Sequence, residues 1–140
     1  MSVTLKFEPN RRILLVQFTG ALSSENLNGL DSEVVAFVKK EGAPKGFVID
    51  CSDVEEVSVP TGEFVRRGQR NSVVSDQDRV YVMPRADMFG LGRMFGTYQR
   101  MVGKKEPIVV KTLTEAFDAL KLDDPNFQPL PPEVGGGLIR

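Results

Sequence analysis

Apolar positions along the chain change their spacing several times, which is typical of strands alternating with helices. Short runs rich in Val, Ile, Leu and Phe predict five strands. These runs cover residues 3–8, 13–19, 46–49, 79–83 and 108–111. The intervening segments predict helices, three of them with apolar residues three and four positions apart. The predicted helices lie between Ser23 and Gly42, from Pro60 to Ser72, from Asp87 to Val102 and from Thr112 to Leu120.

Turn and cap residues mark the predicted boundaries. Pro9 and Asn10 stand between the first two strands and predict a hairpin. Thr112 and Glu115 match a capping box, which opens the last helix. Because strands that alternate with helices favour parallel pairing, the sequence predicts an α/β class fold. We expect a single-domain mixed, mainly parallel sheet with an N-terminal hairpin and covering helices.

The length of 140 residues fits one domain. We expect this domain to span residues 1–122 and the Pro- and Gly-rich residues 123–140 to form a flexible tail. No apolar run approaches the roughly 20 residues of a membrane span. The first residues lack the organisation of a signal peptide. A cytoplasmic location without a membrane span is therefore expected.

Charge and residue types narrow the function classes. The net charge is −1, and residues 63–122 carry 11 basic and 7 acidic side chains, a net of +4. This asymmetry is too mild to predict nucleic-acid binding. The chain has no His and one Cys, which excludes His-based acid–base chemistry and multi-Cys metal sites. We therefore expect no metal, no cofactor and no enzymatic activity.

Two features near residue 50 have simple interpretations. Cys51 follows an apolar run and is interpreted as a small buried hydrophobic residue. Asp50 is followed by further carboxylates, whose spacing matches no calcium-binding loop. A solvated acidic loop is the preferred interpretation of Asp53, Glu55 and Glu56.

The element order and several local motifs resemble the STAS/SpoIIAA-like superfamily, which includes the anti-sigma-factor antagonists. The similar motifs are Gly20 at the end of the second strand, residues 48–50 leading to the helix start at 58–62, and the closing strand and helix at 108–120. Residues 79–83 and 93–95 are similar to the SEC14-like branch. The resemblance covers residues 3–122 and implies the SpoIIAA-like fold.

The family carries a phosphorylatable Ser at the start of its second helix. Counting from Asp50 places Val59 at that position, and counting back from Gly62 places Pro60 there. Neither residue has a hydroxyl group. The resemblance therefore implies a non-enzymatic intracellular signalling or protein-interaction module without the usual phospho-serine switch.

The resemblance also places a partner- or phosphate-binding site at this helix start, because a helix N-terminus favours anions. The expected site residues are Asp50, Ser58, Thr61, Gly62, Arg66 and Arg70. Simpler alternatives remain open. Ser58 could be an N-cap and Thr61 a first-turn residue, and the arginines could form a solvated face.

The predicted helix at 87–102 is rich in methionine and aromatic residues. One stripe at helical spacing predicts a core-facing side, formed by Met88, Leu91, Phe95, Tyr98 and Val102. Gly92 and Gly96 lie one turn apart and predict a close approach by a neighbouring segment. Gly90 and Gly92 do not complete a dinucleotide fingerprint, since Phe95 occupies the third glycine position.

A second function stays open for this helix, an apolar-ligand or lipid-binding carrier module. Its ligand or interface residues would be Met88, Phe89, Met94 and Phe95. The expected partners are thus an unidentified protein or, in the alternative, an apolar small molecule. A twofold homodimer is compatible with the sequence, although no residue requires one.

Overall fold

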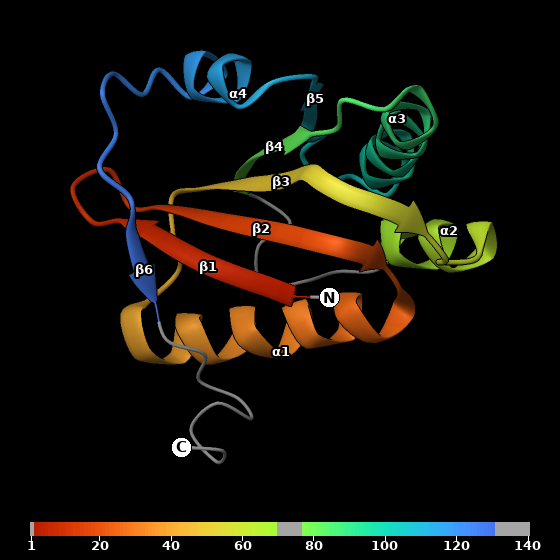
Figure 1. Cartoon of the computed structure of the whole chain (residues 1–140), viewed down its shortest axis with the longest axis horizontal. Helices are drawn as coiled ribbons and strands as arrows, with labels where there is room; N and C mark the ends of the chain where they lie inside the picture. The colour runs from red at the N-terminus through yellow and green to blue at the C-terminus, as the bar shows by residue number, and fades with distance from the viewer. Residues whose placement is uncertain (1, 70–76, 131–140) are drawn as a thin grey trace.

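In the computed structural model, residues 2–69 and 77–130 are described, and they form six strands and four helices (Figure 1). In chain order these elements are β1 (Ser2–Glu8), β2 (Ile13–Leu22), α1 (Ser24–Glu41), β3 (Gly46–Val57), α2 (Thr61–Gln69), β4 (Asp78–Val82), α3 (Ala86–Met101), β5 (Ile108–Val110), α4 (Leu113–Ala119) and β6 (Gln128–Leu130). None of the helices in these two ranges combines the length and apolar character needed to cross a bilayer.

The strands form one sheet in the order β5-β4-β3-β2-β1-β6. β2, β3, β4 and β5 pair in parallel, whereas β1 is antiparallel to both β2 and β6. The β1–β2 pair is the predicted hairpin, with Glu8 opposite Ile13. The expectation of a mixed, mainly parallel sheet that begins with a hairpin is confirmed.

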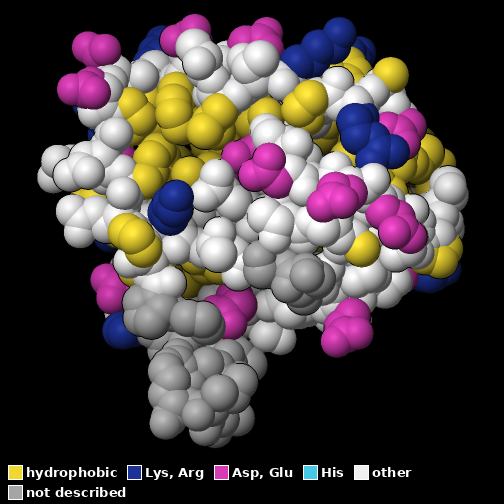
Figure 2. Space-filling view, viewed as in Figure 1, with side chains coloured by type: hydrophobic (Ala, Val, Ile, Leu, Met, Phe, Trp, Pro, Cys, Tyr) yellow, Lys and Arg dark blue, Asp and Glu magenta, His cyan; other side chains and the backbone are white. Residues whose placement is uncertain are grey.

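The two faces of the sheet are covered unequally. One face forms the larger core, in which residues of α1 and Met88 of α3 pack on β1, β2 and β3. The other face forms a smaller core around Val48, Val80 and Ala116 of α4. Among the described helices, only the 7-residue α4 covers this second core, and Figure 2 shows hydrophobic side chains gathered beside it.

The cap residues explain where α1 and α4 begin and end. The Ser23 side chain accepts a hydrogen bond from the N–H of Asn26, and Gly42 ends α1 with a φ of 84°. At α4 the hydroxyl of Thr112 accepts from the N–H of Glu115 and donates to Oε1 of Glu115. The predicted capping residue Thr112 is thus confirmed, and Ser23 and Thr112 each satisfy a backbone N–H group that lacks an intrahelical partner.

β3 is much longer than predicted. Sequence analysis ended this strand at Ile49, but it continues to Val57 beside an equally extended β2. Gly20 does not close β2; it lies inside the strand with a φ of 81°, next to a shift in register. The extra residue at this shift lies in β3, and Gly20 opposite it has a positive φ that Gly adopts readily. β4 pairs with β3 only as far as Asp50, so β2 is the one described strand that pairs with the last part of β3.

The segment after Leu122 also differs from the prediction. Sequence analysis assigned it to a flexible tail, but Gln128–Leu130 pairs with β1 as the edge strand β6. The ring of Phe127 stacks on Phe117, with centroids 5.6 Å apart. The backbone N–H of Asn126 donates to the buried carboxylate of Glu8 at 2.9 Å. Residues 123–130 are therefore part of the domain, and 131–140 lie outside the described residues.

Two of the three glycines of α3, Gly92 and Gly96, face β5 and the chain before it. A Cβ at Gly92 would lie 2.6 Å from Sδ of Met83 and 3.4 Å from Val109. A Cβ at Gly96 would lie 3.3 Å from Cγ of Glu106. The neighbours that come close at these glycines are thus side chains rather than a backbone, and they pack α3 against the edge of the sheet.

Candidate functional site

The start of α2 lies directly after the end of β3. The N–H groups of Glu63 and Phe64 donate to the carbonyl of Pro60, which opens the helix. Ser58 is not the N-cap, because its N–H donates to the carbonyl of Leu22 at 2.9 Å and its hydroxyl lies 3.4 Å from the same oxygen. Ser58 therefore ties the chain to the end of β2, and Thr61 is the first helical residue.

Three residues of the predicted set share the exposed first turns of α2. Thr61, Gly62 and Arg66 are all exposed, and Nη1 of Arg66 lies 3.6 Å from where a Cβ on Gly62 would stand. The Arg66 guanidinium thus folds back over the helix N-terminus, which itself carries partial positive charge. Arg70 lies outside the described residues.

Glu63 anchors this helix start to the neighbouring helix. Its Oε1 accepts a hydrogen bond of 2.6 Å from the hydroxyl of Ser24, the first residue of α1. The starts of α1 and α2 are therefore held side by side, and the exposed Ser58 completes the same surface. We call Ser58, Thr61, Gly62 and Arg66 the α2-start surface.

Asp50 does not belong to the α2-start surface. It is 6% exposed, and its carboxylate accepts from Nε2 of Gln17 at 2.9 Å and from the N–H and hydroxyl of Ser52 at 3.0 and 2.6 Å. Strand geometry of roughly 3.3 Å per residue places it about 26 Å from Ser58. Since side chains alternate along β3, Asp50 faces the α4 side with Val48.

The acidic residues after Asp50 lie on the strand rather than in the predicted loop. Asp53, Glu55 and Glu56 are exposed, as a solvated acidic segment should be. Within residues 2–69 and 77–130, no three His, Cys, Asp or Glu side chains gather as a metal ion would require.

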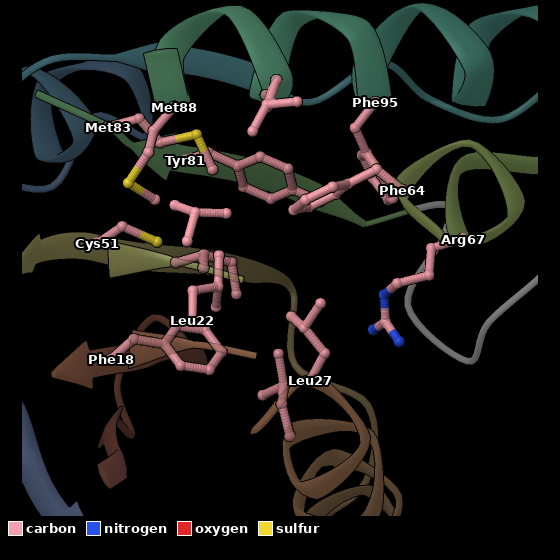
Figure 3. A pocket seen from close by; sticks show the side chains of 15 residues that line it. Phe18, Leu22, Leu27, Cys51, Phe64, Arg67, Tyr81, Met83, Met88 and Phe95 are labelled. Atoms are coloured by element: carbon pink, nitrogen blue, oxygen red, sulfur yellow. The ribbon is translucent and has the colours of Figure 1, made fainter. Parts of the chain in front are cut away.

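A mostly apolar cavity of about 100 Å³ lies between the larger-core face of the sheet and helices α1, α2 and α3 (Figure 3). The lining residues are Phe18, Leu22, Leu27, Leu30, Ile49, Cys51, Val57, Phe64, Arg67, Tyr81, Met83, Met88, Leu91, Gly92 and Phe95. They come from six elements and from Met83 after β4. No local pattern of the sequence joins them, so sequence reasoning found only the α3 portion.

The predicted Met and Phe residues of α3 separate into two groups. Met88 and Phe95 line the cavity, and Met88 is 1% exposed. Phe89 and Met94 are outside the cavity lining, as their position off the helical stripe indicated. Instead, Nζ of Lys111 lies 5.6 Å from the centre of the Phe89 ring. The predicted core-facing stripe is only partly right: Met88 is buried, Leu91, Phe95 and Tyr98 are half-buried and Val102 is 42% exposed. The buried line of α3 runs instead through Met88, Gly92, Gly96 and Gln99, because the two glycines let α3 approach its neighbours closely along that line.

Arg67 is the one charged side chain among the residues that line the cavity. Its Nη1 and Nη2 donate to the two carboxylate oxygens of Asp31 on α1, at 3.0 and 2.8 Å. The Arg67 side chain is 14% exposed, against 38% for Asp31. This bidentate ion pair connects α2 to α1 at the edge of the cavity. Sequence analysis missed it because the partners are 36 residues apart.

Cys51 and Tyr81 are the cavity residues with strongly affected acidity. Burial, reinforced by the nearby Asp50 carboxylate, raises the pKa of Cys51 to about 12. Burial also raises the pKa of Tyr81, although the positive charge of Arg79 opposes this shift. Both groups are therefore uncharged at neutral pH, and the interpretation of Cys51 as a buried small residue is confirmed.

The thiol of Cys51 is expected to react with the disulfide reagent DTNB at pH 8 at least about a hundredfold more slowly in the folded protein than in urea. Only the thiolate attacks, and burial keeps Cys51 protonated. The release of thionitrobenzoate measures both rates, and the urea-unfolded chain provides the reference. Similar rates in both conditions would show that the cavity opens freely to water.

Comparison with known proteins supports the architecture. Neither a protein-family model nor a curated protein matches the chain. Among solved structures, the chain is similar to the anti-sigma factor antagonist SpoIIAA in its unphosphorylated form. The TM-score is 0.57 and the identity 14%, over 86% of this chain and 98% of that chain. This likeness shows that the chain has the STAS/SpoIIAA-like fold, as the sequence resemblance implied.

Proposed function

We propose that this protein is a non-enzymatic protein-interaction module of the SpoIIAA-like type, acting in intracellular signalling. The observation that carries the proposal is the α2-start surface. Thr61 and Gly62 leave the helix N-terminus open to solvent, and Arg66 folds over it. A partner carboxylate or phosphate at this position would meet both the guanidinium and the helix N-terminus.

The proposed module works without a phospho-serine switch. Val59 and Pro60 occupy the positions at which the resemblance places the serine, and the Val59 side chain is 8% exposed in the larger core. Ser58 is held against the end of β2 through Leu22. Regulation would then come from the binding of a partner rather than from modification.

The chemistry of the described residues favours binding over catalysis. Cys51 is buried and its pKa is raised to about 12, so it is a poor nucleophile. The carboxylate of Asp50 is engaged by Gln17 and Ser52. The sequence contains no His that could act as a general base.

Capture of partners from the native cytosol tests this function. The Arg66→Ala variant is expected to weaken partner binding about tenfold or more, because a charged hydrogen bond is lost. Ser58→Ala and Thr61→Ala probe the rest of the surface, and Lys39→Ala, at the exposed far end of α1, is the control. A specific partner whose binding ignored all three surface changes would place the interface elsewhere.

Protein purified from its native host is expected to carry no phosphate on Ser58 or Thr61. The acidic neighbours Glu55, Glu56 and Glu63 oppose a phosphate at this helix start, against the attraction of Arg66. Intact-mass measurement and phosphopeptide mapping check this expectation. Stoichiometric phosphate on either hydroxyl would restore the switch one or two residues from its usual place.

A further inference from the structure

We propose that the cavity between α1, α2 and α3 is a binding site for a small carboxylic acid with a short apolar group, whose carboxylate is held by Arg67. This site is separate from the α2-start surface, since none of Ser58, Thr61, Gly62 and Arg66 lines the cavity. Arg66 and Arg67 are adjacent in α2, but the first is exposed and the second lies at the cavity edge (Figure 3).

The size of the cavity limits the apolar part of the ligand. A dry cavity of about 150 Å³ lined by Leu, Ile and Phe takes up benzene, so about 100 Å³ suits a smaller group such as a short branched chain. Met83 and Met88 both line the space. Their unbranched side chains can change rotamer and adapt to the shape of the occupant.

The guanidinium of Arg67 favours an acid over a neutral compound where its bonds to Asp31 are shared or released. The guanidinium has five N–H donors in a planar fork, and its two bonds to Asp31 run through Nη1 and Nη2. A carboxylate at the cavity edge could therefore share the fork with Asp31 or replace it. The Asp31 side chain is more than a third exposed, so water can solvate it when its partner is taken.

Asp31 competes with the ligand for Arg67 in this arrangement. Its carboxylate already neutralises the guanidinium, and it would repel a second carboxylate nearby. Replacing Asp31 by Asn removes that repulsion while keeping a side chain of similar shape. The two residues of the ion pair should therefore have opposite effects on acid binding, which a purely structural ion pair would not produce.

The test compares 3-methylbutanoate with 3-methylbutan-1-ol, which carry the same isobutyl group. Each is titrated into uniformly ¹⁵N-labelled full-length protein, and amide shifts near Met88 and Cys51 are followed by NMR. We expect the acid to bind more tightly than the alcohol. Arg67→Gln should weaken acid binding roughly tenfold or more and leave alcohol binding nearly unchanged, whereas Asp31→Asn should strengthen acid binding.

Three further variants complete the test. Arg100→Gln also removes an exposed ion pair, with Glu106, but lies outside the cavity lining and should leave both affinities unchanged. Cys51→Leu should fill the cavity and abolish binding of both compounds. If the Cys51→Leu protein does not fold, Val57→Phe fills the same space from a half-buried position and replaces it in the test. Equal affinities for acid and alcohol, or an Arg67→Gln variant that binds the acid normally, would overturn the proposal.

Discussion

A chain that ends at Leu122 is expected to have a free energy of unfolding that is lower than that of the full chain by about 3 kcal/mol or more. This estimate takes about 1 kcal/mol for each lost hydrogen bond and about 0.5–1.5 kcal/mol for a lost aromatic pair. The deletion removes β6 from its pairing with Leu5, Lys6 and Phe7 of β1. It also removes the stacking of Phe127 on Phe117 and the hydrogen bond from Asn126 to Glu8. Urea unfolding followed by circular dichroism measures the loss.

A chain ending at Leu130 is the matched control, because it keeps every contact named above. The difference in free energy of unfolding between the two shortened chains therefore isolates residues 123–130, and it should be about 3 kcal/mol or more. Equal stabilities for the chains ending at Leu122 and Leu130 would contradict the role assigned to β6.

Replacing Glu8 by Gln is expected to destabilise the protein by about 1.5–3 kcal/mol at pH 7, the typical value of a hydrogen bond to a charged group. The Glu8 side chain is buried, and its carboxylate accepts from the N–H groups of Asn126, Asn10 and Arg11 at 2.9, 2.8 and 3.1 Å. A Gln amide offers only one oxygen and turns an N–H₂ toward one of these donors. Urea unfolding at pH 7 checks the size of the loss.

The pH dependence of stability provides a second measurement of the same contact. The hydrogen bond from Asn126, outweighing burial and joined by those of Arg11 and Asn10, lowers the pKa of Glu8 below its ordinary value of 4.5. A carboxyl group whose pKa is lowered by folding stabilises the protein above its unfolded pKa. The wild type should therefore lose stability more steeply than Glu8→Gln as the pH falls below 4.5.

The two changes should not be additive, because the chain ending at Leu122 already lacks the Asn126 donor. The effect of Glu8→Gln should be smaller in the shortened chain than in the full chain, as expected for residues in direct contact. Identical effects in both backgrounds, or parallel pH profiles for wild type and Glu8→Gln, would show that Asn126 contributes nothing to the state of Glu8.

Local signals in the sequence were sufficient for most of the fold. The capping residues Ser23, Gly42 and Thr112 act within one helical turn, so the limits they set were predicted correctly. β6 is different, because Pro129 and its neighbours form a strand only through pairing with β1, more than 120 residues earlier. The extension of β3 to Val57 likewise depends on its pairing with β2, which continues across two register shifts, rather than on local signals in β3.

The residues of the candidate site also divide into those with a local sequence signal and those that depend on contacts between distant segments. The α2 start was found because Pro60 and Gly62 signal a helix boundary within a few residues. Asp50 was assigned to the same site as the α2 start only because a loop was expected between the two. The continuous strand β3 separates them instead. The Arg67–Asp31 pair joins two helices and carries no signal in either segment alone, so only the packing of α1 and α2 reveals it.

Beyond Asp50, no strand within residues 2–69 and 77–130 pairs with the side of β3 that faces away from β2, which has a consequence for association between molecules. Open strand edges invite pairing with strands of other chains, and charged side chains discourage it. Asp53, Glu55 and Glu56 are exposed along this edge, and Nη1 of Arg85 donates to the carbonyl of Glu55 at 2.8 Å. Carboxylate repulsion and this arginine together keep the overhanging strand from acting as a template for aggregation at neutral pH.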